Sequence, residues 1–180
     1  MPQEKFSQNL EVLVVDDEAD IRELLAEFCA ARGFQVATAQ DGRAAVHALE
    51  RANPPFPVVI ADLHLPHADG FAVLEAARRA SASCYVIIVT GYATIDGAVR
   101  AVQAGAYDFL AKPFALGQLE VLFNRIRDRI ALETENRMLT RRIAEDRPQG
   151  AAPASLQDRI RLLEDRVAAL ERMITPGNPR

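Results

Sequence analysis

Short apolar runs alternate with longer amphipathic segments over the first two thirds of the sequence. The apolar runs lie at positions 11–15, 34–39, 58–61, 85–89 and 107–110 and have the composition of buried strands. The segments between them carry apolar residues three and four positions apart, which is the spacing of an amphipathic helix. Five strands alternating with helices predict an α/β domain, in which helices cover both faces of a doubly wound parallel sheet.

Four apolar stripes mark the helices expected between these strands. They consist of Ile21, Leu24, Leu25 and Phe28; of Ala45, Val46 and Leu49; of Val73, Leu74 and Ala77; and of Val99, Val102 and Ala106. A fifth helix is expected to begin near Ala115, and no residue between 117 and 146 forces it to end. We therefore predict that the last helix extends well beyond the domain to which it belongs.

Polar residues stand where four of the five predicted strands end. Asp16 and Asp17 follow the first strand, Asp62 the third, Thr90 the fourth and Lys112 the fifth. In a doubly wound sheet these positions meet at one edge, where such folds bind their ligands. Three carboxylates held together repel one another unless a cation intervenes, and carboxylate oxygens suit Mg²⁺. With a hydroxyl and an amine beside them, they predict a phosphoryl-transfer site in which one carboxylate attacks.

The alternative interpretation is that each aspartate only caps a helix. Asp16 or Asp17 precedes the helix expected to begin near Ala19, and aspartate is a common N-cap residue. Capping explains any one aspartate taken alone. It does not explain polar residues at matching ends of several strands, so we favour the phosphoryl-transfer site.

Four segments in order resemble the response-regulator receiver domain of two-component signalling. They are VLVVDDE (12–18), VVIADLHLPHADG (58–70), VIIVTGYAT (86–94) and GAYDFLAKPF (105–114). Each segment alone is a weak signal, but the set in this order is specific. The resemblance implies a flavodoxin-like (βα)5 fold and a receiver domain over 9–124, preceded by an N-terminal arm at 1–8.

The resemblance also implies a role for each site residue. Asp62 would be the phosphoacceptor. Asp17 and Asp62 would bind Mg²⁺ directly, together with the backbone carbonyl of His64, and Asp16 would act largely through metal-bound water. Thr90 would be the switch hydroxyl, Phe109 the switch aromatic and Lys112 the phosphate partner, with a cis bond between Lys112 and Pro113.

His64 departs from the family pattern, because the position two residues after the phosphoacceptor is often methionine. A histidine near carboxylates raises the alternative of a side-chain metal ligand or a phosphorylated histidine. The interpretation that we favour is that the His64 side chain alters the access of water to the acyl phosphate and so its lifetime.

The chain changes character near residue 124, because all eleven aromatic residues lie before that point. We expect 125–146 to extend the last helix of the receiver, with Leu132, Asn136, Leu139 and Ile143 as a second apolar stripe. An asparagine at an a position favours a parallel two-stranded coiled coil. A linker is expected at 147–155, where Pro148, Gly150 and Pro153 occur.

A second, short helix is expected at 156–174, followed by a disordered tail at 175–180. Its apolar residues follow a heptad spacing: Leu156, Ile160, Leu163, Val167, Leu170 and Ile174. Branched residues at a with leucine at d favour dimers, and arginines at g would face glutamates on a parallel partner. We therefore expect a parallel homodimer through 125–174. The alternative is an amphipathic helix that folds back on its own domain.

Composition limits the remaining function classes. A net charge of −4 and a pI of about 5.4 do not suggest binding to nucleic acid or to an anionic membrane. The N-terminus does not look like a signal peptide, and no apolar run reaches the length of a membrane span. Cys29 and Cys84 lack metal-ligand spacing and are expected to be reduced core thiols, which is consistent with a cytoplasmic protein.

These features predict a two-component response regulator that signals through protein–protein interaction. A sensor histidine kinase would phosphorylate Asp62, and the receiver would then bind or release a downstream protein. It would catalyse only its own phosphorylation and dephosphorylation, so it is not a conventional enzyme. The alternative is a DNA-binding transcriptional regulator that acts through the helical tail, although acidic residues and arginines alternate there instead of forming a basic face.

Overall fold

A computed structural model describes residues 10–91 and 94–145 of the chain. The five strands are β1 (Glu11–Val15), β2 (Gln35–Ala39), β3 (Val58–Asp62), β4 (Tyr85–Thr90) and β5 (Asp108–Ala111). The helices are α1 (Ala19–Ala30), α2 (Gly42–Arg51), α3 (Gly70–Ala80), α4 (Ile95–Gln103) and α5 (Leu116–Glu145). The chain divides into two compact units after Arg129. The first unit is therefore the α/β domain with the beginning of α5.

The sheet has the strand order β2-β1-β3-β4-β5, and every neighbouring pair is parallel. This arrangement confirms the predicted doubly wound flavodoxin-like fold. Two strands run slightly further than their apolar runs, so that Asp62 and Thr90 are themselves the last strand residues of β3 and β4. Asp62 pairs with Val89 and Thr90 with Ala111 in the strand registers. The sheet itself therefore fixes the backbone of both site residues.

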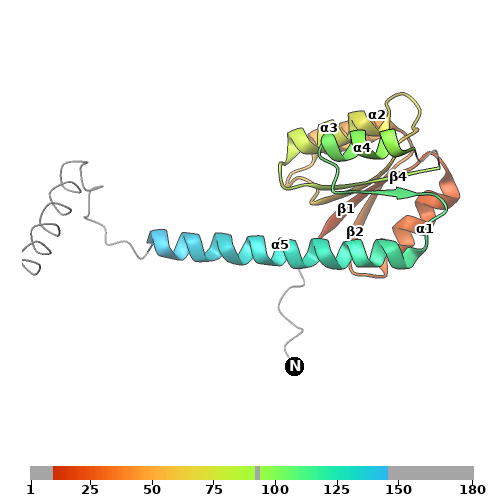
Figure 1. Ribbon diagram of the computed structural model, residues 1–180. Helices are drawn as coiled ribbons and strands as arrows, with labels where there is room; N and C mark the ends of the chain where they lie inside the picture. Colours follow the sequence, from red (N-terminus) through yellow and green to blue (C-terminus); the bar gives the residue numbers. More distant parts are fainter. Residues whose placement is uncertain (1–9, 92–93, 146–180) are drawn as a thin grey trace, which may run out of the picture. The chain divides into compact units, whose positions relative to one another are not determined.

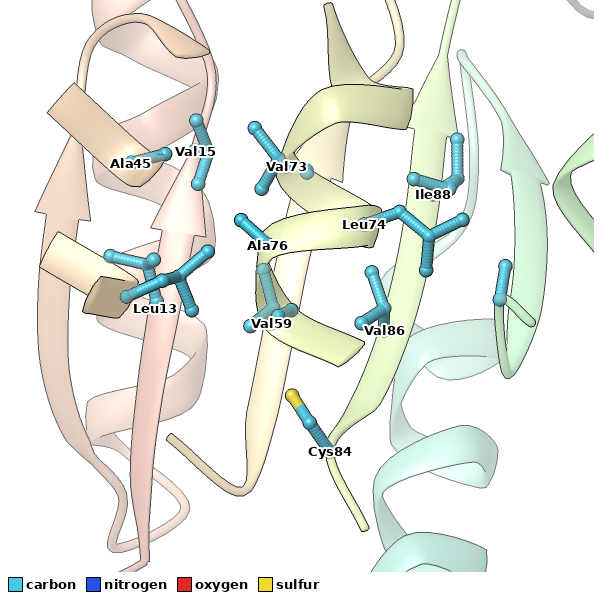
Figure 2. Packing of buried hydrophobic residues seen from close by; sticks show 14 of the residues in the cluster. Leu13, Val15, Ala45, Val59, Val73, Leu74, Ala76, Cys84, Val86 and Ile88 are labelled. Atoms are coloured by element: carbon cyan, nitrogen blue, oxygen red, sulfur yellow. The ribbon is translucent and has the colours of Figure 1, made fainter. Parts of the chain in front are cut away.

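Helices cover both faces of the sheet, with α2, α3 and α4 on one face and α1 and α5 on the other (Figure 1). Figure 2 shows one of these layers, in which Leu13, Val15, Val59, Val86 and Ile88 pack against side chains of α2 and α3. The alternate strand residues, such as Val12, Val14, Ile60 and Ile87, are also fully buried. Because both faces are covered, the three central strands β1, β3 and β4 are buried over nearly their whole length and do not alternate between apolar and polar residues.

The predicted stripe of α4 is wrong at two of its three residues, since only Ala106, which lies beyond the end of the helix, is buried. Val99 and Val102 are 49% and 59% exposed, and Ile95 at the start of the helix is 83% exposed. Ala101 is the buried residue of the described helix. The small side chain of Ala101 is thus on the inner side of the helix, and the larger apolar residues are on its exposed side. Residues 95, 99 and 102 are spaced to share one face of the helix.

The first part of α5, which we call its receiver half (116–129), packs into the domain. Leu119, Leu122, Phe123 and Ile126 are buried. The ring of Phe123 lies 4.8 Å from that of Phe34 and 6.0 Å from that of Phe28. Arg32 forms an ion pair with Glu120 at 3.2 Å, and Arg127 donates a hydrogen bond to the backbone carbonyl of Arg32. The receiver half is thus held by apolar contacts at its centre and by arginines at its rim.

The second part of α5, its tail half (130–145), is helical to Glu145, as the sequence predicts. Three of its large apolar side chains are exposed: Leu132 at 60%, Met138 at 57% and Leu139 at 48%. None of the helices in the described ranges is both long and apolar enough to cross a membrane. The expectations for 1–8, 147–155, 156–174 and 175–180 fall outside the described residues.

Candidate functional site at the carboxyl edge of the sheet

The carboxyl ends of four neighbouring strands bring the predicted site residues together. Asp16 and Asp17 come directly after β1, Asp62 ends β3, Thr90 ends β4 and Lys112 follows β5. Backbone hydrogen bonds continue past the strand ends, because the Lys112 amide donates to the Thr90 carbonyl over 2.8 Å. The predicted cis bond between Lys112 and Pro113 is present. The hydrogen bond to Thr90 anchors the backbone of the lysine to the sheet.

The Lys112 ammonium group lies among carboxylates. Its Nζ is 2.7 Å from Asp62 Oδ2, 2.8 Å from Asp16 Oδ2 and 3.2 Å from Glu18 Oε1. The side chains of Asp16 and Asp62 are only 1% and 8% exposed, whereas that of Glu18 is 61% exposed. One largely buried cation thus bridges two buried carboxylates, which places the amine within reach of any group attached to Asp62.

Burial and charge shift the proton affinities of this cluster. Desolvation raises the pKa of Asp16 above its ordinary value, and the bonds and charge of Lys112 offset only part of this effect. Burial alone would lower the pKa of Lys112, but hydrogen bonds to Asp16 and Asp62 and their charges raise it overall. The pKa of Asp16 is raised mainly by its burial, whereas the pKa of Lys112 is raised by the two carboxylates that it contacts. The cluster therefore has an affinity for additional positive charge.

Three carboxylates could hold that charge as a metal ion. Asp16, Asp17 and Asp62 each offer one oxygen, and these oxygens lie within 4.8 Å of one another. Oxygens around an octahedral Mg²⁺ are about 3–4 Å apart, given ligand distances of about 2.1 Å. Asp17 is exposed, so the group is open to solvent on one side. The oxygen-only donor set fits Mg²⁺.

The helix-cap interpretation of the aspartates is wrong for α1. The N-cap residue of that helix is Glu18, which makes no side-chain cap hydrogen bond. Asp41, Asp69 and Thr94 cap α2, α3 and α4, each accepting from a backbone amide. Asp16 does accept from the amide of Glu18 over 3.0 Å, but its other oxygen binds Lys112. Asp16 and Asp62 thus bind the lysine instead of capping a helix.

The predicted switch residues lie on β4 and β5. Thr90 is fully buried at the end of β4. Phe109 on β5 is partly buried and packs against the core layer that faces α2, α3 and α4. The backbone amide of His64 donates to Asp62 Oδ1 over 2.9 Å, and its imidazole Nδ1 lies 3.2 Å from Thr90 Oγ1.

Two contacts of the site were missed by sequence reasoning. One is the ion pair of Lys112 with Glu18. The signal for it in the sequence is that a third acidic residue directly follows Asp16 and Asp17. The other is the contact between the His64 imidazole and the Thr90 hydroxyl. Sequence reasoning considered His64 as a metal ligand, a phosphorylation site or a barrier to water, and no spacing rule connects it with Thr90. Both contacts depend on the path of loops that leave the strands.

A sequence profile of the response regulator receiver domain matches residues 12–124. The chain belongs to the response regulator receiver family. The matched segment contains every site residue described above, from Asp16 to Lys112. The receiver fold, the site at the carboxyl edge and the family match are therefore three consistent observations.

Curated proteins of known name are also similar to this chain in sequence. The regulatory protein AtoC of Escherichia coli is 34% identical over 128 residues, which are 71% of this chain and 27% of AtoC. The C4-dicarboxylate transport transcriptional regulatory protein DctD of Rhizobium meliloti is 36% identical over 140 residues, which are 77% of this chain and 30% of DctD. The chain thus spans less than a third of these curated relatives.

A solved structure also resembles this receiver. The beryllofluoride-activated NtrC4 receiver domain dimer is 33% identical, with a TM-score of 0.59. That likeness covers 64% of this chain and 94% of the NtrC4 chain. The shared part is therefore nearly the whole NtrC4 receiver domain.

Proposed function

We propose that this receiver takes a phosphoryl group on Asp62 from a sensor histidine kinase in the cytoplasm. The observation that carries the proposal is the position of Asp62, which ends β3 in contact with Lys112 and within reach of two further aspartates. A carboxylate in that position has a counter-charge for the incoming phosphate and neighbours that hold a cation. The membership in the receiver family supports the same assignment.

The chemistry is a transfer of one phosphoryl group between two side chains. A carboxylate oxygen of Asp62 attacks the phosphorus, and a new P–O bond forms while the P–N bond to the kinase histidine breaks. The histidine nitrogen keeps the electron pair of the broken bond. Lys112, whose Nζ already lies 2.7 Å from Asp62, moves its bond to a phosphoryl oxygen. Catalysis is then mostly positioning and charge stabilisation.

Asp16, Asp17 and Asp62 would hold Mg²⁺, together with the backbone carbonyl of His64. When bound, the ion neutralises negative charge that accumulates between the phosphoryl group and the carboxylates. Asp17 is the exposed member of the group and Asp16 the buried one. We assign direct binding to Asp17 and Asp62 and an indirect contact through water to Asp16. The receiver would turn over no metabolite and catalyse only the phosphorylation and dephosphorylation of its own Asp62.

Acetyl phosphate, a small phosphodonor, tests the assignment without the kinase. Intact-protein mass measurement should show one added phosphoryl group in the presence of Mg²⁺ and none with EDTA. Asp62→Asn should remain unlabelled, whereas Asp69→Asn, which alters an exposed cap of α3, should be labelled like the unaltered chain. Full labelling of Asp62→Asn would assign the phosphoacceptor to another residue.

The signal would leave the receiver through a protein–protein interaction. A phosphoryl oxygen beside Thr90 offers its hydroxyl a charge-assisted hydrogen bond, and Phe109 can then move into the space that is freed. The exposed apolar residues Ile95, Val99 and Val102 lie on α4, the element that precedes β5. An exposed apolar face of this kind supports binding to a downstream protein whose access depends on the switch.

We further propose that the protein is a parallel homodimer held by 125–174. The exposed Leu132 and Leu139 are seven residues apart on the tail half of α5, which is the heptad spacing. The NtrC4 likeness is to a receiver dimer, so an interface within the receiver itself is the competing arrangement. Sedimentation of Leu132→Gln/Leu139→Gln against the control Arg142→Gln separates the two. If the double variant stays fully dimeric, the interface lies in the receiver instead of the tail half of α5.

The relative DctD is a transcriptional regulatory protein, which keeps DNA binding as a second candidate function. The match covers 30% of DctD. A gel-shift assay of the phosphorylated chain on genomic fragments at physiological salt distinguishes the candidates. Signalling through proteins alone predicts no retarded band, and a specific band would establish the DNA-binding candidate.

A further inference from the structure

The loop that follows β3 contacts the first residue of α2. This segment, which we call the β3–α3 loop (63–69), connects Asp62 at the end of β3 to α3. The backbone amide of Gly42, the first residue of α2, donates a hydrogen bond to the Pro66 carbonyl over 3.2 Å. An N–H group in the first turn of a helix has no partner within that helix. The β3–α3 loop therefore supplies the acceptor that α2 itself lacks at this position.

Gly42 leaves no room for a side chain beside the loop. A Cβ atom at position 42 would overlap the Ala68 carbonyl oxygen and would lie 2.6 Å from the Ala68 carbonyl carbon. Both are backbone atoms, which cannot rotate away as the end of a side chain can. The backbone of Gly42 does not have a positive φ, and alanine is the better helix former. The glycine is therefore required for space, and a side chain at this position would push the loop away from α2.

The part of the loop that contacts Gly42 is a strained turn. His67 has a φ of 68°, and the amide of Ala68 donates to the Pro66 carbonyl over 2.8 Å. A three-residue turn closed in this way around a residue with positive φ is rare and strained. Such a turn persists only where its surroundings hold it. Because the same Pro66 carbonyl accepts from Gly42, the start of α2 contributes to holding the turn.

We propose that Gly42 is a positioning residue for the metal site, because it holds the β3–α3 loop where the backbone carbonyl of His64 can bind Mg²⁺. This inference rests on the proposed function. Only residues 63–65 separate Asp62 from Pro66, so a displacement at Pro66 moves the backbone of His64 as well. A carboxylate ligand can reorient by side-chain rotation, whereas a backbone carbonyl moves only with its chain. Mg²⁺ requires nearly ideal octahedral geometry, so its affinity depends on the position of that carbonyl.

The Mg²⁺ affinity of the full chain tests this role without a phosphodonor. Calorimetric titration of Gly42→Ala should show binding at least about 10-fold weaker than in the unaltered chain, as is typical when a residue that supports a metal ligand is changed. The matched control is Gly117→Ala in the first turn of α5, where an added Cβ would meet nothing within 4 Å. That variant should bind Mg²⁺ like the unaltered chain. Equal affinities of Gly42→Ala and the unaltered chain would overturn the proposal.

A second control separates the position of the loop from general loss of stability. Ile126→Val removes a methyl group from a fully buried side chain of α5, on the other face of the sheet. It should destabilise the fold and leave the Mg²⁺ affinity unchanged. A comparable loss of affinity in Ile126→Val would overturn the proposal, because metal binding would then follow the stability of the whole domain.

Hydrogen exchange tests the contact in the unaltered chain, where no substitution can impair folding. If the loop binds Mg²⁺ at least about 10-fold more tightly when it contacts Gly42, saturating Mg²⁺ must favour that contact by the same factor, since coupling is reciprocal. Exchange of the Gly42 amide should slow accordingly. The control is the Ala44 amide in the same turn, which donates to Asp41 and not to the loop. An unchanged rate at Gly42, or equal slowing at Ala44, would overturn the proposal.

Failure of the proposed function gives a different result. Asp17→Ala would then bind Mg²⁺ as well as the unaltered chain does, which would place the ion outside the carboxylate group and overturn the role of Gly42 as well. Weakened binding by Asp17→Ala together with full binding by Gly42→Ala would overturn the role of Gly42 alone. We expect both variants to bind Mg²⁺ more weakly than the unaltered chain.

Discussion

The carboxyl edge of the sheet and the receiver half of α5 both contain buried side chains, but different forces hold them. At the edge, Asp16, Asp62 and Lys112 are charged groups that stabilise one another. In the receiver half, Leu119, Phe123 and Ile126 are apolar and exclude water. Breaking a buried ion pair is expensive, but the pair as a whole contributes little net stability. Apolar burial contributes directly. The charged groups of the edge thus add little to the stability of the domain, whereas the apolar residues of α5 stabilise it.

The largest expected effect is on α5. Phe123→Ala should lower the free energy of unfolding by about 3–5 kcal/mol, because it leaves a cavity between the rings of Phe28 and Phe34. Urea unfolding measures the loss. The control is Val121→Ala on the same helix, where the side chain is 50% exposed and the change should stay within about 0.5 kcal/mol. Equal losses in the two variants would mean that the apolar contacts of Phe123 do not hold the helix.

Alkaline pH acts on the apolar layers, and for each pH unit its expected effect is smaller than that of Phe123→Ala. Burial raises the pKa of Cys29 and of Cys84 to about 12, from an ordinary value of 9.0. The folded protein favours the neutral thiol, so this contribution to stability is complete below pH 9 and is lost as pH rises toward 12. Each thiol should reduce the free energy of unfolding by about 1.4 kcal/mol per pH unit in that window.

Cysteine variants isolate this effect from the titration of Lys112, whose pKa is also raised. Cys29→Ala and Cys84→Ala should each flatten the dependence of the unfolding free energy on pH between 9 and 12, and the double variant should flatten it further. A slope that does not change in the double variant would assign the alkaline loss to other groups. Because a buried neutral thiol is inert, we also expect both cysteines to resist alkylation at pH 8 until the protein unfolds.

The smallest effect on stability is expected at Asp62, the proposed phosphoacceptor. Asp62→Asn removes one negative charge from the cluster and leaves the bond between Lys112 and Asp16 intact. Its amide oxygen can still accept from Lys112. The free energy of unfolding should therefore change by no more than about 1 kcal/mol, because the lost attraction to lysine is offset by reduced repulsion between carboxylates. If Asp62→Asn lowered the free energy of unfolding as much as Phe123→Ala does, the two regions would not differ in their contribution to stability.

The sequence predicts the sheet and most of the site for a physical reason. Strands buried on both faces are continuously apolar, so their ends are marked by the first polar residue, and Asp62 and Thr90 were found in this way. The α4 stripe was wrong because apolar spacing does not tell which side of a helix meets the core when Ala101 makes the contact. The imidazole of His64 reaches Thr90 through a loop conformation, which no periodic pattern encodes.

The most direct test of the account is to locate the phosphoryl group by mass spectrometry. An acyl phosphate on aspartate is reduced by borohydride to homoserine, which marks the modified position permanently. After incubation of the chain with acetyl phosphate and Mg²⁺, we expect homoserine at position 62, with aspartate retained at positions 16 and 17. Homoserine at position 16 or 17, or an unmodified residue 62 in a chain that carries phosphate, would contradict the assignment of Asp62 as the phosphoacceptor.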